Sequence, residues 1–300
     1  MEPKAPVDPR PVGIADCAGT EVAEMLVVTS DQAGAPTPDE VAQGPGEVST
    51  CYVSHSGCAV KRVAGVWVNA GGKLWQLSTK PLKLRTGACP GGPDEARPAG
   101  VGSAERVELA ADGGHQVVVN PPPRASENEY EETTRFVASI ATTLYFKTTT
   151  YTNFCGAHGY TTSRYFAHDL LGVKGRYFSE EPTDNAELLQ QAGALFKSDV
   201  ATSHPFQYAT TLPYYAEGAL HFVAQLTAGS THVESDGLRG PYERSVFLPT
   251  AWLGVNFAYV SRPPPALAAA VATRNVRVYG WSLLGDAGLA PTSRYKDWTR

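Results

Sequence analysis

The chain has 300 residues, a formal net charge of −5, 42% hydrophobic residues and 18% charged residues. This composition excludes an intrinsically disordered chain, and the absence of a dense lysine and arginine block disfavours nucleic acid as a partner. No apolar run approaches the roughly 18–20 residues that cross a bilayer, so we expect a folded protein that does not span the membrane.

Four of the five cysteines lie before residue 90, among glycines and prolines, and none forms a CxxC motif. In loop-rich regions of secreted proteins, cysteines in such positions form disulfides that restrict the unfolded chain. Cys51 and Cys58 could close a short loop, and Cys17 and Cys89 a longer one, which would leave Cys155 unpaired. The alternative is that all five are buried thiols of a cytosolic protein.

The segment "GVWVNAGGKLWQLST" predicts a β-hairpin. Val66 and Val68 alternate with Trp67, the stretch 69–72 supplies turn residues, and the alternation resumes over 74–77. The amino-terminal region is therefore expected to be a small β-rich domain.

A proline run followed by acidic residues, "VVVNPPPRASENEYEE", indicates a domain boundary near residue 125. We expect a β-rich, glycine- and proline-rich domain over 1–125 and an α+β domain over 126–262. A carboxy-terminal extension over 263–300 would contain a final strand in "NVRVYGWSLL".

The segment 133–153 has the period of two that is typical of a strand with one buried face. Phe136, Ala138 and Ile140 fall on one side, and Ser139 on the other. At about 3.3 Å per residue the whole segment is too long for one straight strand, so we expect it to bend, bulge or split near Thr148. The segment "YTTSRYFAHD" alternates again and predicts the next strand.

Between these strands, the residues "CGAHG" predict a tight turn. Gly156 and Gly159 can adopt positive φ without steric cost, and we interpret His158 as an imidazole packed inside the corner. The alternative is a general base at His158, with His168 and Asp169 as companions, in a hydrolase.

A helix is predicted over 184–197, where leucine, alanine and phenylalanine recur at helical spacing behind a polar cap. The segments "EGALHFVAQLT" and "ERSVFLP" read as strands on either side of a turn at Asp236 and Gly237. The expected fold is α+β, with a mainly antiparallel sheet and one packed helix, preceded by the small β-rich amino-terminal domain.

The chain lacks the sequence signatures of common enzymes, including the phosphate-binding loop, the zinc helix and the serine nucleophile elbow. No catalytic residue, metal site or cofactor is predicted. Aromatic side chains are the candidates for a binding surface, with cross-strand packing in the sheet as the alternative. These candidates, together with His158, are Tyr145, Tyr151, Tyr160, Tyr165, Tyr214 and Tyr215.

The turn with its flanking strands, the helix, and the strands "GALHFVAQLT" and "VFLP" resemble a family of bacterial extracytoplasmic domains of unknown function. Members occur beside some polysaccharide deacetylases and in the outer part of lysozyme-sensing anti-sigma factors. The resemblance covers about residues 130–255, and Cys155 stands where the family usually has glycine. The deacetylase catalytic domain is missing, so the resemblance implies a domain that binds and does not catalyse.

These observations favour a non-enzymatic, cell-envelope or secreted binding or structural protein, lipoprotein-like and periplasmic or extracellular. The resemblance implies recognition of a protein such as lysozyme or of a wall glycan. The alternatives are the hydrolase centred on His158 and a subunit of an extracellular assembly in which strand edges pair between chains.

Overall fold

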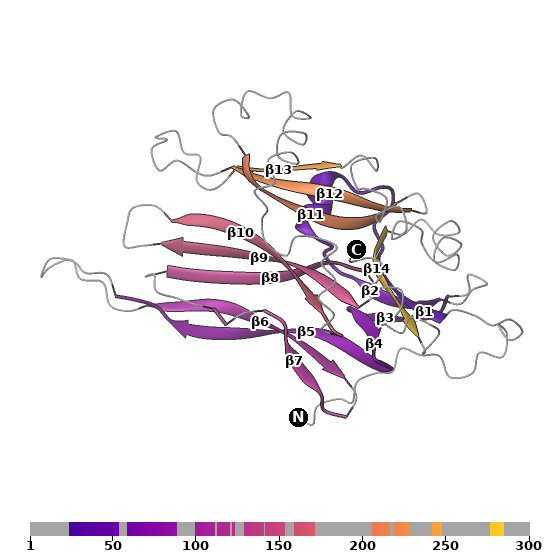
Figure 1. The fold of residues 1–300 in the computed structure, drawn as a ribbon. Helices are drawn as coiled ribbons and strands as arrows, with labels where there is room; N and C mark the ends of the chain where they lie inside the picture. Colours follow the sequence, from indigo (N-terminus) through magenta and orange to yellow (C-terminus); the bar gives the residue numbers. More distant parts are fainter. Residues whose placement is uncertain are drawn as a thin grey trace, which may run out of the picture.

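A computed structural model describes a set of segments that together contain one helix and a 14-stranded sheet. Strands dominate these segments, and the sheet is mixed and curled (Figure 1). The predicted helix over 184–197 and the predicted turn at Asp236 lie outside them. The described residues are 24–53, 59–88, 100–111, 113–120, 122–123, 129–140, 142–153, 159–171, 206–216, 219–228, 242–247 and 277–284.

The first antiparallel group pairs in the order β3, β2, β1, β14. Strand β1 is apolar without alternation because both of its faces are buried: Met25 and Val27 enter one core cluster, and Leu26 and Val28 enter two others. The final strand predicted in "NVRVYGWSLL" is confirmed as β14. The strands are β1 (Glu24–Ser30), β2 (Ser49–Val53), β3 (Ala59–Ala64) and β14 (Arg277–Leu284).

The second group contains the predicted hairpin, which is confirmed. Gly71 and Gly72 have φ of 59° and 69°, and two successive positive φ values are what a tight turn between right-handed twisted strands requires. Strand β5 pairs with β6 along its length, and β7 pairs with β6. The strands are β4 (Trp67–Ala70), β5 (Lys73–Arg85), β6 (Val101–Ala111) and β7 (Gln116–Val118).

The third group is an antiparallel meander of β8 (Glu129–Ile140), β9 (Thr143–Asn153) and β10 (Tyr160–Asp169). The predicted break near Thr148 is wrong, because β9 runs unbroken through its threonines, which as β-branched residues favour strands. The chain instead reverses after Ile140, and Leu170 N donates to Thr142 O across the turn at 3.1 Å.

The prediction of one buried face for this segment is also wrong. Phe136 and Phe146 pack in a cluster with residues of β4 and β6, while Val137 and Tyr145 pack in another with residues of α1, β11 and β12. Strand alternation alone places the neighbours Phe136 and Val137 on opposite faces. The register shift between Phe136 and Ala138 explains why Ala138, two residues after Phe136, joins Val137 in the second cluster.

The fourth group comprises β11 (Phe206–Ala216), β12 (Ala219–Ala228) and β13 (Tyr242–Phe247), all antiparallel. The strands predicted in "EGALHFVAQLT" and "ERSVFLP" are confirmed as β12 and β13. In Figure 1 this group lies on one side of β8–β10, and β5–β7 lie on the other.

Short contacts join the groups into one sheet. Strands β14 and β8 pair in parallel at Gly280↔Ser139 and its neighbour, and β6 and β8 pair in parallel at Ser103↔Glu131. Strands from both sides of residue 125 therefore share one sheet. The domain division at that residue stays a prediction, but in the described residues it does not interrupt strand pairing.

The helix in the described part of the chain is α1 (Pro38–Gln43), which the sequence analysis did not predict. It begins with a capping box, in which Glu40 N donates to Thr37 Oγ1 at 3.3 Å and Thr37 N donates to Glu40 Oε2 at 2.7 Å. Its buried residues Val41 and Ala42 join the core beside β11 and β12.

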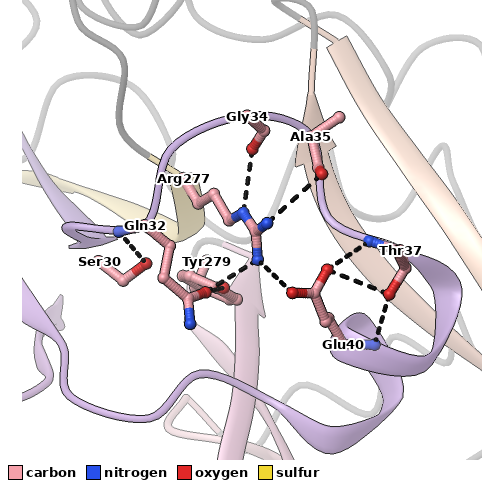
Figure 2. A network of polar contacts seen from close by, with 8 residues as sticks. All are labelled: Ser30, Gln32, Gly34, Ala35, Thr37, Glu40, Arg277 and Tyr279. Atoms are coloured by element: carbon pink, nitrogen blue, oxygen red, sulfur yellow. Dashed lines mark hydrogen bonds and ion pairs between the residues drawn. The ribbon is translucent and has the colours of Figure 1, made fainter.

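Arg277, at the start of β14, holds the loop before α1 in place (Figure 2). Its Nε donates to Gly34 O at 3.0 Å, its Nη2 to Ala35 O at 3.5 Å and its Nη1 to Gln32 Oε1 at 2.9 Å. Nη1 also lies 3.2 Å from Glu40 Oε1. One guanidinium thus satisfies loop carbonyls and the carboxylate that caps the helix.

Candidate functional site

Half of the predicted binding tyrosines lie in the core. Tyr145, Tyr165 and Tyr215 are buried in the cluster that joins β8–β10 to α1, β11 and β12. Burial raises the pKa of Tyr165 far above its ordinary value, as do the negative charges of Glu243 and Asp39, and burial alone raises that of Tyr215. These side chains follow the packing alternative that the sequence left open.

Tyr214, on β11, is half-buried and packs at the edge of the same cluster. Its ring stacks on that of His221 with 5.2 Å between centroids. The ring centroid of Phe247, on β13, is also 5.2 Å from that of Tyr214. A ring nitrogen of His221 is 3.2 Å from Ala216 O, and Phe247 is 40% exposed. These three rings form an aromatic row on β11–β13, and a cavity of about 10 Å³ lies beside Tyr214.

Tyr151 and Tyr160 are both near the end of the β9–β10 hairpin, but Thr161 and not Tyr160 is opposite Tyr151, so the two tyrosines lie on opposite faces of the sheet. Tyr151 is half-buried, and Tyr160 is 41% exposed. The turn residues Gly156 and His158 lie outside the described part of the chain.

Gly159 is described, and it does not use the positive φ that glycine can adopt. Glycine is accommodated there for another reason: a Cβ at this position would overlap the phenol of Tyr151. The absence of a side chain at Gly159 leaves room for the Tyr151 phenol beside the start of β10.

A groove opens beside Tyr151, between β6 and β8, with a volume of about 390 Å³. The two strands pair at Ser103↔Glu131, and Gly102 approaches Tyr130 so closely that a Cβ would lie 2.8 Å from Tyr130 O. Figure 1 shows β8 directly beside β6 at this end of the sheet. The residues that line this β6–β8 groove are Lys83, Val101, Gly102, Ser103, Glu129, Tyr130, Glu131 and Tyr151.

Beyond the groove, hydrogen bonds from side chains connect β6 and β8 where backbone-to-backbone hydrogen bonds would otherwise do so. Thr134 N donates to Glu105 Oε2 at 2.8 Å, Asn120 Nδ2 donates to Glu105 O at 2.6 Å, and Val107 N donates to Asn120 Oδ1 at 2.8 Å. These bonds satisfy backbone groups that a regular ladder would pair, and they hold the strands in fixed positions beside the groove.

The walls of the groove combine charge with apolar surface. Glu129, Glu131 and Lys83 are exposed, and Val101 is 75% exposed. Asn153 Nδ2 donates to Glu129 Oε2 at 3.3 Å, which orients that carboxylate. The groove can therefore accept hydrogen bonds from hydroxyls or cations and offer a tyrosine ring and an aliphatic side chain for contact.

Tyr130 forms the floor of the groove. It is buried, and its hydroxyl donates to Glu132 Oε2 at 2.5 Å. Strand alternation separates the acidic residues at the start of β8. Glu129 and Glu131 line the groove, whereas Glu132 accepts the hydrogen bond of Tyr130.

Cys51 is a free, buried thiol, with Sγ 3.6 Å from Thr29 Oγ1. Strand β2 directs Cys51 into the core with Met25 and Val27. Its predicted pairing with Cys58 stays a prediction. Cys17, Cys58, Cys89 and Cys155 lie outside the described residues, so the wider disulfide pattern stays a prediction.

Within the described ranges, no group of three or more histidine, cysteine, aspartate or glutamate residues is placed to hold a metal ion. The same part of the chain has no helix with the length and hydrophobicity to cross a bilayer.

Sequence reasoning missed Lys83, Val101 and Ser103, because β6 and β5 reach the groove only through the fold. The alternation of Glu129 and Glu131 was visible, since residues two apart on a strand share a face. Comparison of the chain with protein-family models, with curated proteins and with solved structures finds no match.

Proposed function

We propose that this chain is a non-enzymatic binding protein that is secreted or belongs to the cell envelope, and that its ligand occupies the β6–β8 groove. The observation that carries this proposal is the groove itself, where exposed Val101 and half-buried Tyr151 lie beside the carboxylates of Glu129 and Glu131. A concave surface with apolar contact area and a small number of polar groups is the usual form of a ligand site.

The ligand classes proposed from the sequence both suit these walls. The hydroxyls of a wall glycan would donate to Glu129 and Glu131 while a sugar ring stacks on Tyr151. A basic protein such as lysozyme would place lysine or arginine side chains against the same carboxylates. A periplasmic or extracellular location, proposed from the family resemblance, would bring the chain into contact with either.

Isothermal titration calorimetry with lysozyme and with soluble peptidoglycan fragments tests the proposal. We expect one of these probes to bind the wild-type chain, and Tyr151→Ala to weaken that binding by about 10- to 30-fold, the size of effect typical of a central aromatic contact. Glu131→Gln should weaken it as well, because the amide keeps the shape of the side chain and removes its charge.

Phe247→Ala is the matched control, since it removes an exposed aromatic side chain from β13, far from the groove lining. Its affinity should equal that of the wild type. Binding that survives Tyr151→Ala and fails in Phe247→Ala would move the site to the aromatic row of β11–β13. No binding of either probe would overturn the proposed ligands.

A further inference from the structure

A polar cluster lies inside the core between the β8–β10 meander and the β11–β13 group. Lys147 Nζ, from β9, is 3.7 Å from Glu243 Oε2, on β13. Gln225 Nε2, from β12, donates to the same Glu243 oxygen at 3.4 Å, and Ser245 Oγ donates a short hydrogen bond to Gln225 Oε1. An amine, a carboxylate and a primary amide are thus linked through shared contacts.

Strand register explains why these residues meet. Gln225 is directly opposite Ser245 in the β12–β13 pair, and Glu243 shares the face of Ser245 because it is two residues away on the same strand. Lys147 shares the face of Tyr145 on β9, which packs in the core cluster that contains residues of β12. The cluster therefore bridges two groups of strands that are far apart in the sequence.

The two reacting side chains of the cluster are buried, and the side chain of Glu243 is 24% exposed at its edge. Gln225 is 3% exposed, and the side chain of Lys147 is 10% exposed. Lys147 Nζ also lies 5.5 Å from the centroid of the Tyr165 ring, which covers it on one side. Burial of the amine and the amide limits their contact with bulk water, which would otherwise hydrate the amine and hydrolyse a reacting carbonyl group.

Each contact has a role in acyl transfer between an amine and an amide. A lysine amine is a nucleophile once it has lost its proton, and Glu243 is within reach to accept that proton. The hydrogen bond from Ser245 to Gln225 Oε1 lies where negative charge would develop on the carbonyl oxygen. Glu243 also contacts Gln225 Nε2, which is the nitrogen that would leave.

We propose that Lys147 and Gln225 form an intramolecular isopeptide bond, with Glu243 as the proton carrier and Ser245 as the donor to the carbonyl oxygen. This site is separate from the β6–β8 groove and does not depend on the function proposed for that groove. Fixed positions in a packed core supply the proximity that makes such a reaction effectively unimolecular.

The reaction is balanced without an oxidant or a co-reactant. The Lys147 ammonium gives one proton to the Glu243 carboxylate, and the neutral Nζ attacks Gln225 Cδ, so that the carbonyl electron pair moves onto Oε1. A second proton moves from Nζ to Nε2 by way of the carboxylate. The carbonyl then re-forms, the Cδ–Nε2 bond breaks, and ammonia leaves with the proton held by Glu243, as ammonium.

The product would tie β9 covalently to β12 across the interface between the two groups. A cross-link of residues distant in sequence restricts the unfolded chain and so favours the folded state. It would also replace a buried ion pair, whose desolvation is costly, by a neutral amide.

Intact-mass spectrometry of the purified full chain tests the proposal, followed by peptide mapping. The expected result is a wild-type mass that is lower than the sequence mass by one ammonia, with the segments of Lys147 and Gln225 recovered as one branched peptide. Lys147→Arg is the matched control, because it keeps the positive charge beside Glu243 but lacks the primary amine, and it should show the full mass.

Glu243→Gln should also show the full mass, and Ser245→Ala should cross-link more slowly, with circular dichroism confirming that each variant is folded. If a variant does not fold, the wild-type mass and peptide map still show whether the isopeptide bond forms. A wild-type chain of full mass after prolonged incubation would overturn the proposal. Loss of ammonia that maps to any other residue would overturn it equally.

Discussion

The two ends of the β8–β10 meander differ in what surrounds the same three strands. At the closed end, defined by residues 136–140 and 144–147, side chains are buried on both faces of the sheet. At the open end, defined by residues 129–131, 151–153 and 160–162, the outermost side chains are exposed and a groove lies beside the junction of β8 with β6. A continuous strand therefore changes its role from core to surface along its length.

Two tyrosines of β9 differ in burial although their sequence positions are equivalent. Tyr145 and Tyr151 lie on the same strand and on the same face, six residues apart in sequence. Tyr145 is enclosed by residues of the core, while Tyr151 lines the groove. Residue type and strand alternation are equal for both, so the neighbouring elements alone decide which tyrosine is available to a ligand.

The largest predicted effect is at the closed end. Phe146 is fully buried, and its ring stacks on Phe166 with 5.2 Å between centroids and meets Phe136 edge-on at 6.3 Å. Phe146→Ala should lower the free energy of unfolding by about 3–5 kcal/mol, because it leaves a cavity in a packed core. Urea denaturation checks this, with Tyr151→Ala as the open-end counterpart at about 1 kcal/mol or less. Equal losses would remove the distinction between the ends.

A smaller effect is expected where β14 joins the closed end. A Cβ at Gly280 would overlap Ser139 Oγ and lie 2.8 Å from Ser139 N, so Gly280→Ala should force the two backbones apart. Overpacking of this kind costs about 1–3 kcal/mol. The midpoint of thermal unfolding measures it, and a variant as stable as the wild type would show that the parallel contact of β14 with β8 is not close-packed.

The matching change at the open end is Gly159→Ala, which displaces a side chain and not a backbone. The new Cβ would overlap the Tyr151 phenol, which can turn toward solvent, so we expect a loss of stability of about 1 kcal/mol or less. Ligand affinity should fall with it, because Tyr151 leaves the groove wall. A fall in stability as large as that of Gly280→Ala would contradict the assignment of this end as open.

The elements that depend on local pattern could be predicted from the sequence. The β4–β5 hairpin, β10 and β12 follow from alternation and turn residues. Helix α1 was missed although "TPDE" contains a capping box with proline after the cap, because six residues are too few for a helical stripe.

Features that depend on distant neighbours could not be predicted. The groove joins Lys83 and Val101 to Glu131 through one parallel contact between β6 and β8. Gly159 was valued for the positive φ that glycine can adopt, because a sequence does not distinguish a glycine needed for its backbone angle from one needed for its missing Cβ.

The smallest predicted effect lies away from both ends, at the loop before α1. The hydrogen bond from Thr37 N lowers the pKa of Glu40, and the contact with Arg277 lowers it further. A lowered folded-state pKa adds stability that is complete above the ordinary value of about 4.5 and is lost as the pH falls through the folded value. Glu40→Gln should therefore be less stable than the wild type at neutral pH by about 0.5–1 kcal/mol, the range for a solvent-screened group.

The wild type and Glu40→Gln should converge as the pH is lowered below 4, because both side chains are then uncharged. Urea denaturation at a series of pH values measures the difference. A gap that is constant with pH would show that the carboxylate charge does not contribute to the Arg277 network.

Hydrogen exchange with and without bound ligand tests most directly whether the two ends have different roles. The account predicts that in the free chain the amides of 136–140 and 144–147 exchange most slowly, since they open only with the core. The bound probe should then add protection at 101–103, 129–131 and 151, and leave the closed end unchanged. Added protection confined to β11–β13, or spread evenly over the meander, would contradict it.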